Sequence, residues 1–298
     1  MGLITRRRAG KVLLAGCAGA ILTTRRAAGA ALINSVIRGV RLGAQSFAFR
    51  DRPLDACIAA FREVGLGECE LFHGHVEPAG MSLTGEPMTK WRMETPDSHF
   101  QEIRKKFDAA EILLYAYDNS SFHKAATDET IERGFQMARA MGVKYITSST
   151  TISMVPRIDK FAQKYKMTVG FHGSDNTSNP DMFSNGESYV RALQGASPYM
   201  GITLDIGHFV AAGGDPVSFI TEHHAKMVTL HIKDRKKNRG PSVPWGEGDT
   251  PITAVLQLLR DKGWKILANI EYDYGKPGMD SVAEVKKCMD YCKQALES

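Results

Sequence analysis

The sequence predicts an α/β fold, a single (β/α)8 barrel, and three observations support this prediction. Strand-like segments alternate with amphipathic helices along most of the 298 residues, and such alternation is typical of a parallel sheet. The alternation repeats eight times, which favours closure of the sheet into a barrel. An open, doubly wound sheet is the alternative, but no G-x-G-x-x-G loop follows the first strand.

The elements are expected in regular order along the chain. The strands are expected at 39–47, 66–73, 111–117, 143–149, 167–173, 200–207, 227–233 and 265–273. A helix is expected after each strand, at 54–65, 97–109, 127–141, 156–166, 186–195, 215–224, 251–263 and 280–296. Start signals such as "RPLD", "TDET", "GDPV" and "DTPI" precede several helices, and glycines such as Gly65, Gly142 and Gly263 close others. Residues 74–96 and 234–249 are expected to be long, irregular loops after strands.

The first thirty residues are expected to form an export signal. They contain six basic residues and no acidic ones, and "TRRRAGKVLLAGCAGAIL" joins a basic start to an apolar stretch. "AGA" before Ala31 suits a cleavage site, and the arginine cluster resembles a twin-arginine signal. A periplasmic or exported bacterial protein is therefore expected, with residues 31–298 forming the barrel. The alternatives are a basic N-terminal helix and, ranked lower, a lipid anchor at Cys17.

Charge and cysteine content narrow the classes of partner. The net charge is +5, but the six basic residues of the leader leave about −1 for residues 31–298. We therefore expect no nucleic-acid partner, and no other stretch is long enough to span a bilayer. The cysteines after the leader, Cys57, Cys69, Cys288 and Cys292, are expected to be buried and unbridged. The sequence leaves open whether the chain forms a homo-oligomer.

Four strands place an ionisable group on the face opposite their apolar residues. In "ITLDIGH", Ile202, Leu204 and Ile206 share one face of the expected strand and Asp205 lies on the other. The same pattern recurs in "TVGFHGS", "VTLHIKD" and "LANIEYD". The four groups are His172, Asp205, His231 and Glu271.

These four groups are expected to converge. They lie at the ends of strands five to eight, where adjacent strands are about 4.8 Å apart. Two imidazoles and two carboxylates suit one divalent metal ion, and Mn, Co, Zn, Fe, Ni and Mg are the candidates. The alternative is a metal-free polar core in which Asp205 and Glu271 pair with Lys233 and nearby histidines.

The motifs "LDIGHF", "LHIKD", "WGEGDTPI" and "NIEYD" resemble the sugar phosphate isomerase/epimerase group of xylose isomerase-like TIM barrels, over residues 39–296. That group includes tagatose and psicose epimerases, inosose dehydratase and, more distantly, endonuclease IV. The resemblance implies a metal site of Glu, Asp, His and Glu, which falls on His172, Asp205, His231 and Glu271. His172 departs from the pattern, because sugar epimerases usually have a glutamate there.

This departure bears on the expected mechanism. In the epimerases the resemblance implies two metal-bound glutamates that flank the substrate, and only Glu271 is retained here. A one-base reaction is therefore expected, in which Glu271 or His208 removes a proton next to a metal-polarised carbonyl. Elimination, hydration or same-face isomerisation would follow.

Further pocket residues are expected around the metal. His208 matches the group's D-x-x-H histidine, although it could also be a rim histidine that only bonds Asp205. Lys233 is expected to hold a substrate oxygen or neutralise an enolate, with an ion pair to Glu271 or Asp205 as the alternative. The expected substrate-binding residues are Glu70, Gln45, His73, His75 and Trp245. Glu70 could instead pair with Lys233, and Gln45 and Trp245 could be packing residues.

The expected activity is that of a metal-dependent isomerase, epimerase or lyase acting on a carbohydrate. The basic run "KDRKKNRG" is interpreted as a solvated loop rather than a phosphate site. An unphosphorylated sugar, keto-sugar or 3-keto-glycoside is therefore the expected substrate. The alternatives are an endonuclease IV-like phosphodiesterase and a non-catalytic, exported carbohydrate-binding barrel.

Overall fold

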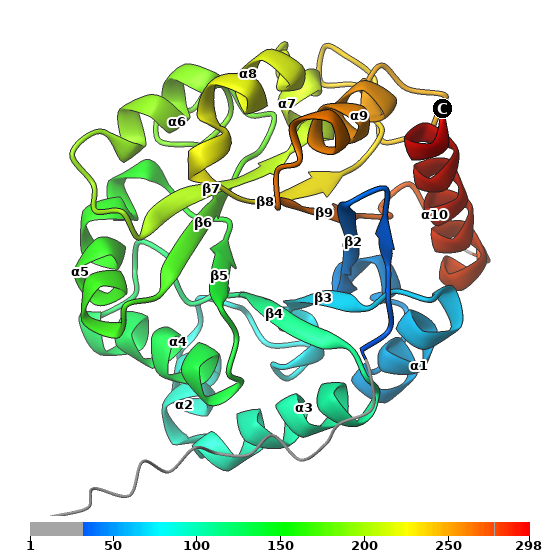
Figure 1. The fold of residues 1–298 in the computed structure, drawn as a ribbon. Coiled ribbons are helices and arrows are strands. Elements are labelled where there is room, and N and C mark those ends of the chain that lie inside the picture. Colours follow the sequence, from blue (N-terminus) through cyan, green and yellow to red (C-terminus); the bar gives the residue numbers. More distant parts are fainter. Residues whose placement is uncertain (1–31, 277) are drawn as a thin grey trace, which may run out of the picture. The chain divides into compact units, whose positions relative to one another are not determined.

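A computed structural model describes residues 32–276 and 278–298, and they form a closed barrel of parallel strands surrounded by helices (Figure 1). The strands pair in sequence order from β2 to β9, and β9 pairs with β2 to close the sheet. The predicted (β/α)8 barrel is confirmed. The predicted export signal at 1–30 lies outside the described residues. Among the described residues, no helix combines the length and the apolar character that a membrane span needs.

The eight barrel strands lie within the ranges expected from the sequence or within one residue of them. They are β2 (Val40–Gln45), β3 (Glu68–Phe72), β4 (Leu113–Asp118), β5 (Tyr145–Ser148), β6 (Thr168–His172), β7 (Met200–Asp205), β8 (Met227–Ile232) and β9 (Leu267–Ile270). A short strand that was not expected, β1 (Val36–Ile37), pairs antiparallel with β2.

Each barrel strand is followed by at least one α-helix. The helices are α1 (Leu54–Val64), α2 (Glu86–Glu94), α3 (Asp97–Ala109), α4 (Asp128–Ala140), α5 (Val155–Tyr165), α6 (Gly186–Leu193), α7 (Ile206–Ala211), α8 (Pro216–His223), α9 (Ile252–Lys262) and α10 (Ser281–Glu297). Two of them correct the sequence analysis. Helix α2 occupies part of 74–96, which was expected to be irregular, and α7 begins at Ile206, which was assigned to a strand.

Both corrections have a physical cause. Helix α2 buries only Met88 and Arg92, so it lacks the apolar stripe that indicates a helix in a sequence. Helix α7 begins early because the Asp205 side chain accepts a hydrogen bond from the backbone N–H of His208, at 2.7 Å. An aspartate in that position is a helix N-cap, so the strand ends where the functional residues begin.

A buried ion pair anchors α2 and the loop before it. The guanidinium of Arg92 donates to Glu77 Oε1 at 2.8 Å and Oε2 at 3.0 Å, and both side chains are almost fully buried. Arg92→Ala leaves the Glu77 carboxylate buried without its charge partner, so we expect the free energy of unfolding to fall by about 3–5 kcal/mol. Urea denaturation measures this loss. Arg104→Ala is the matched control, because its ion pair with Asp108 is partly exposed and should contribute about 1 kcal/mol or less. Equal effects of the two changes would contradict the prediction.

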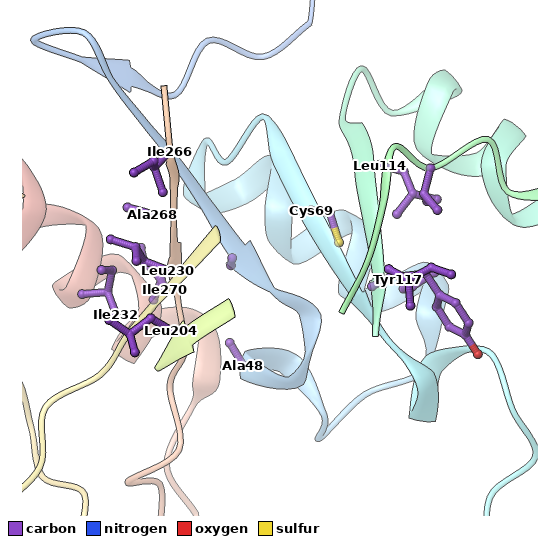
Figure 2. Packing of buried hydrophobic residues seen from close by; sticks show 14 of the residues in the cluster. Ala48, Cys69, Leu114, Tyr117, Leu204, Leu230, Ile232, Ile266, Ala268 and Ile270 are labelled. Carbon is purple, nitrogen blue, oxygen red and sulfur yellow. The ribbon is translucent and has the colours of Figure 1, made fainter. Parts of the chain in front are cut away.

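The apolar core lies mainly between the outer face of the barrel and the helices. Figure 2 shows Leu204, Leu230, Ile232 and Ile270 gathered beside the last strands, and all four are at most 2% exposed. The four cysteines of the described residues, Cys57, Cys69, Cys288 and Cys292, are free and buried, as expected. The interior of the barrel, in contrast, contains polar side chains, and Glu70, His231 and Asn269 are each fully buried.

Candidate metal centre

His172, Asp205, His231 and Glu271 meet at the carboxyl ends of β6 to β9. One ligand atom from each lies within 4.8 Å of the other three. The strand register accounts for this, because Asp205 is paired with His231 across β7 and β8, and Glu271 follows the last pair of β8 and β9. The structure therefore brings together all four predicted ligands.

Each of the four side chains is held by its outer atom. His172 Nδ1 contacts Ser149 Oγ at 3.1 Å, and Asp205 Oδ1 accepts from the backbone N–H of His208 at 2.7 Å. His231 Nε2 faces the Glu70 carboxylate at 3.0 Å, and Glu271 Oε1 pairs with Lys233 Nζ at 2.9 Å. This leaves one inward atom on each residue.

The four inward atoms are buried and face one another. Among the described residues, His172 Nε2, Asp205 Oδ2, His231 Nδ1 and Glu271 Oε2 make no hydrogen bond of good geometry, although the Lys233 ammonium lies 2.9 Å from Asp205 Oδ2. His231 Nδ1 and Glu271 Oε2 lie 2.9 Å apart. Buried polar atoms are almost always satisfied, and a cation bound between these four atoms would satisfy all of them. Two nitrogens and two oxygens are ligands that transition metals accept, and these residues fit such an ion.

Glu70 fixes the orientation of His231. Its carboxylate is fully buried and accepts from Thr147 Oγ1 at 2.7 Å and Asn269 Nδ2 at 2.8 Å, besides facing His231 Nε2. Burial opposes the charge of Glu70, but His231 outweighs burial and lowers the carboxyl pKa. A carboxylate behind a histidine keeps the proton on the outer nitrogen and leaves the inner one free for a metal. Glu70 does not pair with Lys233.

Glu70→Gln should weaken metal binding. Loss of the carboxylate behind a metal-ligating histidine typically lowers metal affinity about 10–100-fold, and competition with a chromogenic chelator measures the change. Glu68→Gln, two residues earlier on β3, is the matched control because Glu68 pairs with Arg41 instead. Affinities of the two variants that agree within experimental error would contradict the role of Glu70.

Lys233 joins three carboxylates beside the centre. Its ammonium lies 2.9 Å from Asp205 Oδ2, 2.9 Å from Glu271 Oε1 and 3.0 Å from Asp273 Oδ2, with 2% of its side chain exposed. Burial alone would lower the pKa of Lys233, but the three carboxylates raise it. In return, burial would raise the pKa of Glu271, and Lys233 lowers it. Lys233, Asp205 and Glu271 therefore stay charged at neutral pH, whereas burial raises the pKa of Asp273.

Gly207 makes room for this lysine. A Cβ at Gly207 would come within 3.1 Å of the Cβ and Cγ atoms of Lys233, closer than side-chain carbons normally approach. This contact explains the glycine in "DIGH", and it brings His208 close to Lys233. His208 Nε2 lies 3.3 Å from Lys233 Nζ. Burial, together with Lys233 and His172, lowers the pKa of His208 to about 4, so the imidazole is neutral at physiological pH.

The predicted substrate-binding residues divide into two groups. Gln45 lies next to the centre and donates to Glu70 at 3.3 Å. His73 pairs with Asp118 at 3.1 Å, and His75 contacts Ser46 and the backbone of Arg52. Trp245 packs edge-on against Tyr291. It lines a cavity of about 330 Å³, and none of the described residues that line this cavity belongs to the metal centre.

Three residues around the centre were given no role in the sequence analysis. Ser149 directly follows β5, where a serine gives no spacing signal. Asp273 lies two residues after Glu271, so the strand pattern places it on the same inward face without indicating a role. Arg235 lies in the basic run that was interpreted as a solvated loop, yet only 10% of its side chain is exposed. The signal that could have identified Arg235 is its place two residues after Lys233, in a loop that follows a barrel strand.

The fold and the cluster define a TIM-barrel protein with a candidate metal site at the carboxyl ends of its strands. Residues 58–295 match the family described as "Xylose isomerase-like TIM barrel". The chain belongs to this family, and the resemblance found in the sequence is confirmed. Comparison with curated proteins finds no significant match.

Solved structures show the same fold at low sequence identity. L-ribulose 3-epimerase is 14% identical with a TM-score of 0.65, covering 87% of this chain and 95% of that one. The IOLI protein with a bound zinc atom is 12% identical with a TM-score of 0.66, covering 87% and 98%. A sugar phosphate isomerase/epimerase from Parabacteroides distasonis is 15% identical with a TM-score of 0.62, covering 89% and 98%.

Proposed function

We propose that this protein is a metal-dependent isomerase, epimerase or lyase that acts on an unphosphorylated sugar or keto-sugar. The observation that carries the proposal is the set of four buried, inward-facing ligand atoms at the carboxyl end of the barrel, where the active sites of such barrels lie. Family membership and the epimerase among the similar structures support the reaction class.

The residues around the centre fit proton transfer next to a carbonyl. A bound divalent ion would polarise the carbonyl and acidify the neighbouring C–H group. Glu271 is the more accessible of the two carboxylates, with 8% of its side chain exposed against 0% for Asp205. Because Lys233 keeps Glu271 ionised, this carboxylate is ready to accept the proton. Lys233 and His208 lie beside it, where negative charge would develop on the substrate oxygen.

His172 favours a one-base reaction. Its ring is held at Nδ1 by Ser149 and turns Nε2 toward the centre, so no second carboxylate stands where an epimerase of the two-glutamate type has one. Elimination, hydration or proton return on the same face are the outcomes that one carboxylate supports.

The charges near the centre favour a substrate without phosphate. Lys233 is paired with three carboxylates and Arg235 with Asp175 at 3.0 Å. Neither cation is therefore free to neutralise a phosphate group. We also propose export through residues 1–30, which rests on the sequence alone and which cell fractionation of an epitope-tagged chain tests.

The Lys233 ion pairs also keep a second candidate open. A metal-free polar core would contain the same pairs, so a carbohydrate-binding barrel without catalysis is the alternative. Incubating the metal-loaded protein with D-fructose or L-ribulose in deuterated water separates the two. Incorporation of deuterium at the carbon next to the carbonyl supports the enzyme, whereas sugar binding without exchange and without metal supports the binding protein.

A further inference from the structure

One arginine connects three of the loops around the metal centre. Arg235 donates through Nη2 to Asp175 in the loop after β6, at 3.0 Å, and through Nε and Nη2 to the carbonyl of Gly240, at 3.1 and 2.7 Å. Its Nη1 faces His208 Nδ1 on α7, which follows β7. Arg235 itself follows β8, so a single buried side chain ties together the loops after three neighbouring strands.

The fold holds this arginine firmly in place. The carboxylate of Asp234 accepts backbone N–H groups from Gly246 at 2.8 Å, Gly248 at 2.9 Å and Thr250 at 3.2 Å, which wraps the loop around it. A Cβ at Gly248 would come within 1.8 Å of Asp234 Oδ1, so the loop requires glycine there. The backbone N–H of Arg235 donates to Thr250 Oγ1 at 3.0 Å. The guanidinium is therefore placed before any ligand binds.

His208 is contacted by two cations and can accept from only one of them. Lys233 Nζ lies 3.3 Å from Nε2, and Arg235 Nη1 contacts Nδ1 at a shorter distance. A neutral imidazole has one lone pair and one N–H. Lys233 already has three carboxylates within 3.0 Å, whereas Nη1 of Arg235 has no other acceptor among the contacts of the described residues. The unprotonated nitrogen of His208 is therefore Nδ1, which accepts a hydrogen bond from Arg235 Nη1.

We propose that Arg235 is a positioning residue that takes the Nδ1 lone pair of His208 and so fixes the neutral ring with its proton on Nε2. That nitrogen lies 3.6 Å from Asp205 Oδ2, beyond hydrogen-bond length, so its N–H is free to donate beside the metal centre. His208 is then a donor to a substrate oxygen and cannot take the proton from carbon. This catalytic consequence rests on the proposed function and leaves Glu271 as the proton acceptor, while the tautomer itself does not depend on activity.

The tautomer is read directly by nitrogen NMR. The full-length chain is labelled with 15N-histidine, and long-range 1H–15N correlations are recorded at pH 7.5 with zinc and after chelation. The His208→Gln variant, which lacks one set of signals, identifies the ring of His208. We expect Nδ1 of His208 to resonate as an unprotonated nitrogen and Nε2 as a protonated one. A proton on Nδ1, or on both nitrogens, would overturn the proposal.

Variants of Arg235 test its part in the effect. In Arg235→Gln the fixed pattern should give way to intermediate shifts of both nitrogens, as two tautomers exchange, and Arg235→Lys should restore part of it. Arg133→Gln is the matched control, because Arg133 is equally buried and bonds two backbone carbonyls and Asp97 far along the chain from His208. It should cost similar stability and leave the His208 signals unchanged. An unchanged pattern in Arg235→Gln, or in Arg235→Met should Arg235→Gln not fold, would overturn the role of Arg235.

Exchange with D-fructose or L-ribulose separates this inference from the proposed function. Loss of a fixed donor should lower kcat for exchange about tenfold or more in Arg235→Gln, with a smaller change in KM. Absence of exchange in the wild-type protein would refute the proposed function and the catalytic role of His208 with it. The NMR result would still decide the tautomer.

Discussion

His231→Ala is expected to reduce the metal content from about one ion per chain to near zero. His231 is fully buried, and it supplies the ligand nitrogen that faces Glu271 across 2.9 Å. Loss of a ligand should cost more than the about 10–100-fold in affinity that loss of an outer partner costs. Elemental analysis of the purified protein after incubation with zinc or manganese measures the change.

The experiment needs controls for folding and for histidine content. His172→Ala removes a ligand that is 16% exposed, so it should lose the metal with less disturbance of the barrel. His99→Ala removes a histidine of α3 that packs edge-on against Trp91, and it should keep the metal. Circular dichroism reports whether each variant is folded. Folded His231→Ala with undiminished metal would remove His231 from the ligand set, and wild-type protein without metal would identify the strand ends as a paired polar core.

The barrel and the convergence of the four candidate ligands were predictable because they depend on local pattern. Parallel strands bury one face and turn the other inward, so a charged group such as Asp205 or Glu271 on the inward side breaks the apolar pattern visibly. The closed order of strands then dictates that residues at consecutive strand ends meet. No contact between distant residues had to be guessed.

The partners of the ligands were not predictable in the same way. Ser149 contacts His172 from a neighbouring strand end, and Glu70 reaches His231 across the interior from β3. Such contacts depend on side-chain direction and barrel diameter, which a single sequence does not record. Trp245, expected either at the substrate or as a packing residue, packs on Tyr291 of α10, and its substrate-binding role stays a prediction. A loop sequence alone does not fix the direction in which the loop folds.

These outer contacts assign different roles to Glu271 and His208 in the proposed mechanism. The inward ligand set alone would allow Glu271 or His208 to take a proton from the substrate. The contacts made by Lys233 and Arg235 separate the two residues, because one keeps a carboxylate ionised and the other occupies a lone pair of an imidazole. In the proposed mechanism, the distinction between base and hydrogen-bond donor therefore depends on Lys233 and Arg235, two positions apart in the loop after β8.

Glu271→Gln should abolish deuterium exchange into the substrate while the protein still binds metal. The amide has the same shape and keeps an oxygen that can ligate, but it cannot accept a proton from carbon. Removal of a general base should lower the rate about 10²–10⁴-fold. Proton NMR of D-fructose or L-ribulose in deuterated water, recorded at saturating metal, measures the rate independently of any loss of metal affinity.

Asp273→Asn is the matched control for Glu271→Gln. Asp273 also pairs with Lys233, at 3.0 Å, but it is not one of the four inward ligands. If loss of a negative charge next to Lys233 were enough to stop the reaction, both variants would fail equally. We expect the Asp273→Asn rate to stay within about tenfold of the wild-type rate, because the base and the ligand set are intact. A metal-loaded Glu271→Gln variant as active as its parent would remove Glu271 from proton transfer, and His208 would then have to accept the proton despite the donor at its Nδ1.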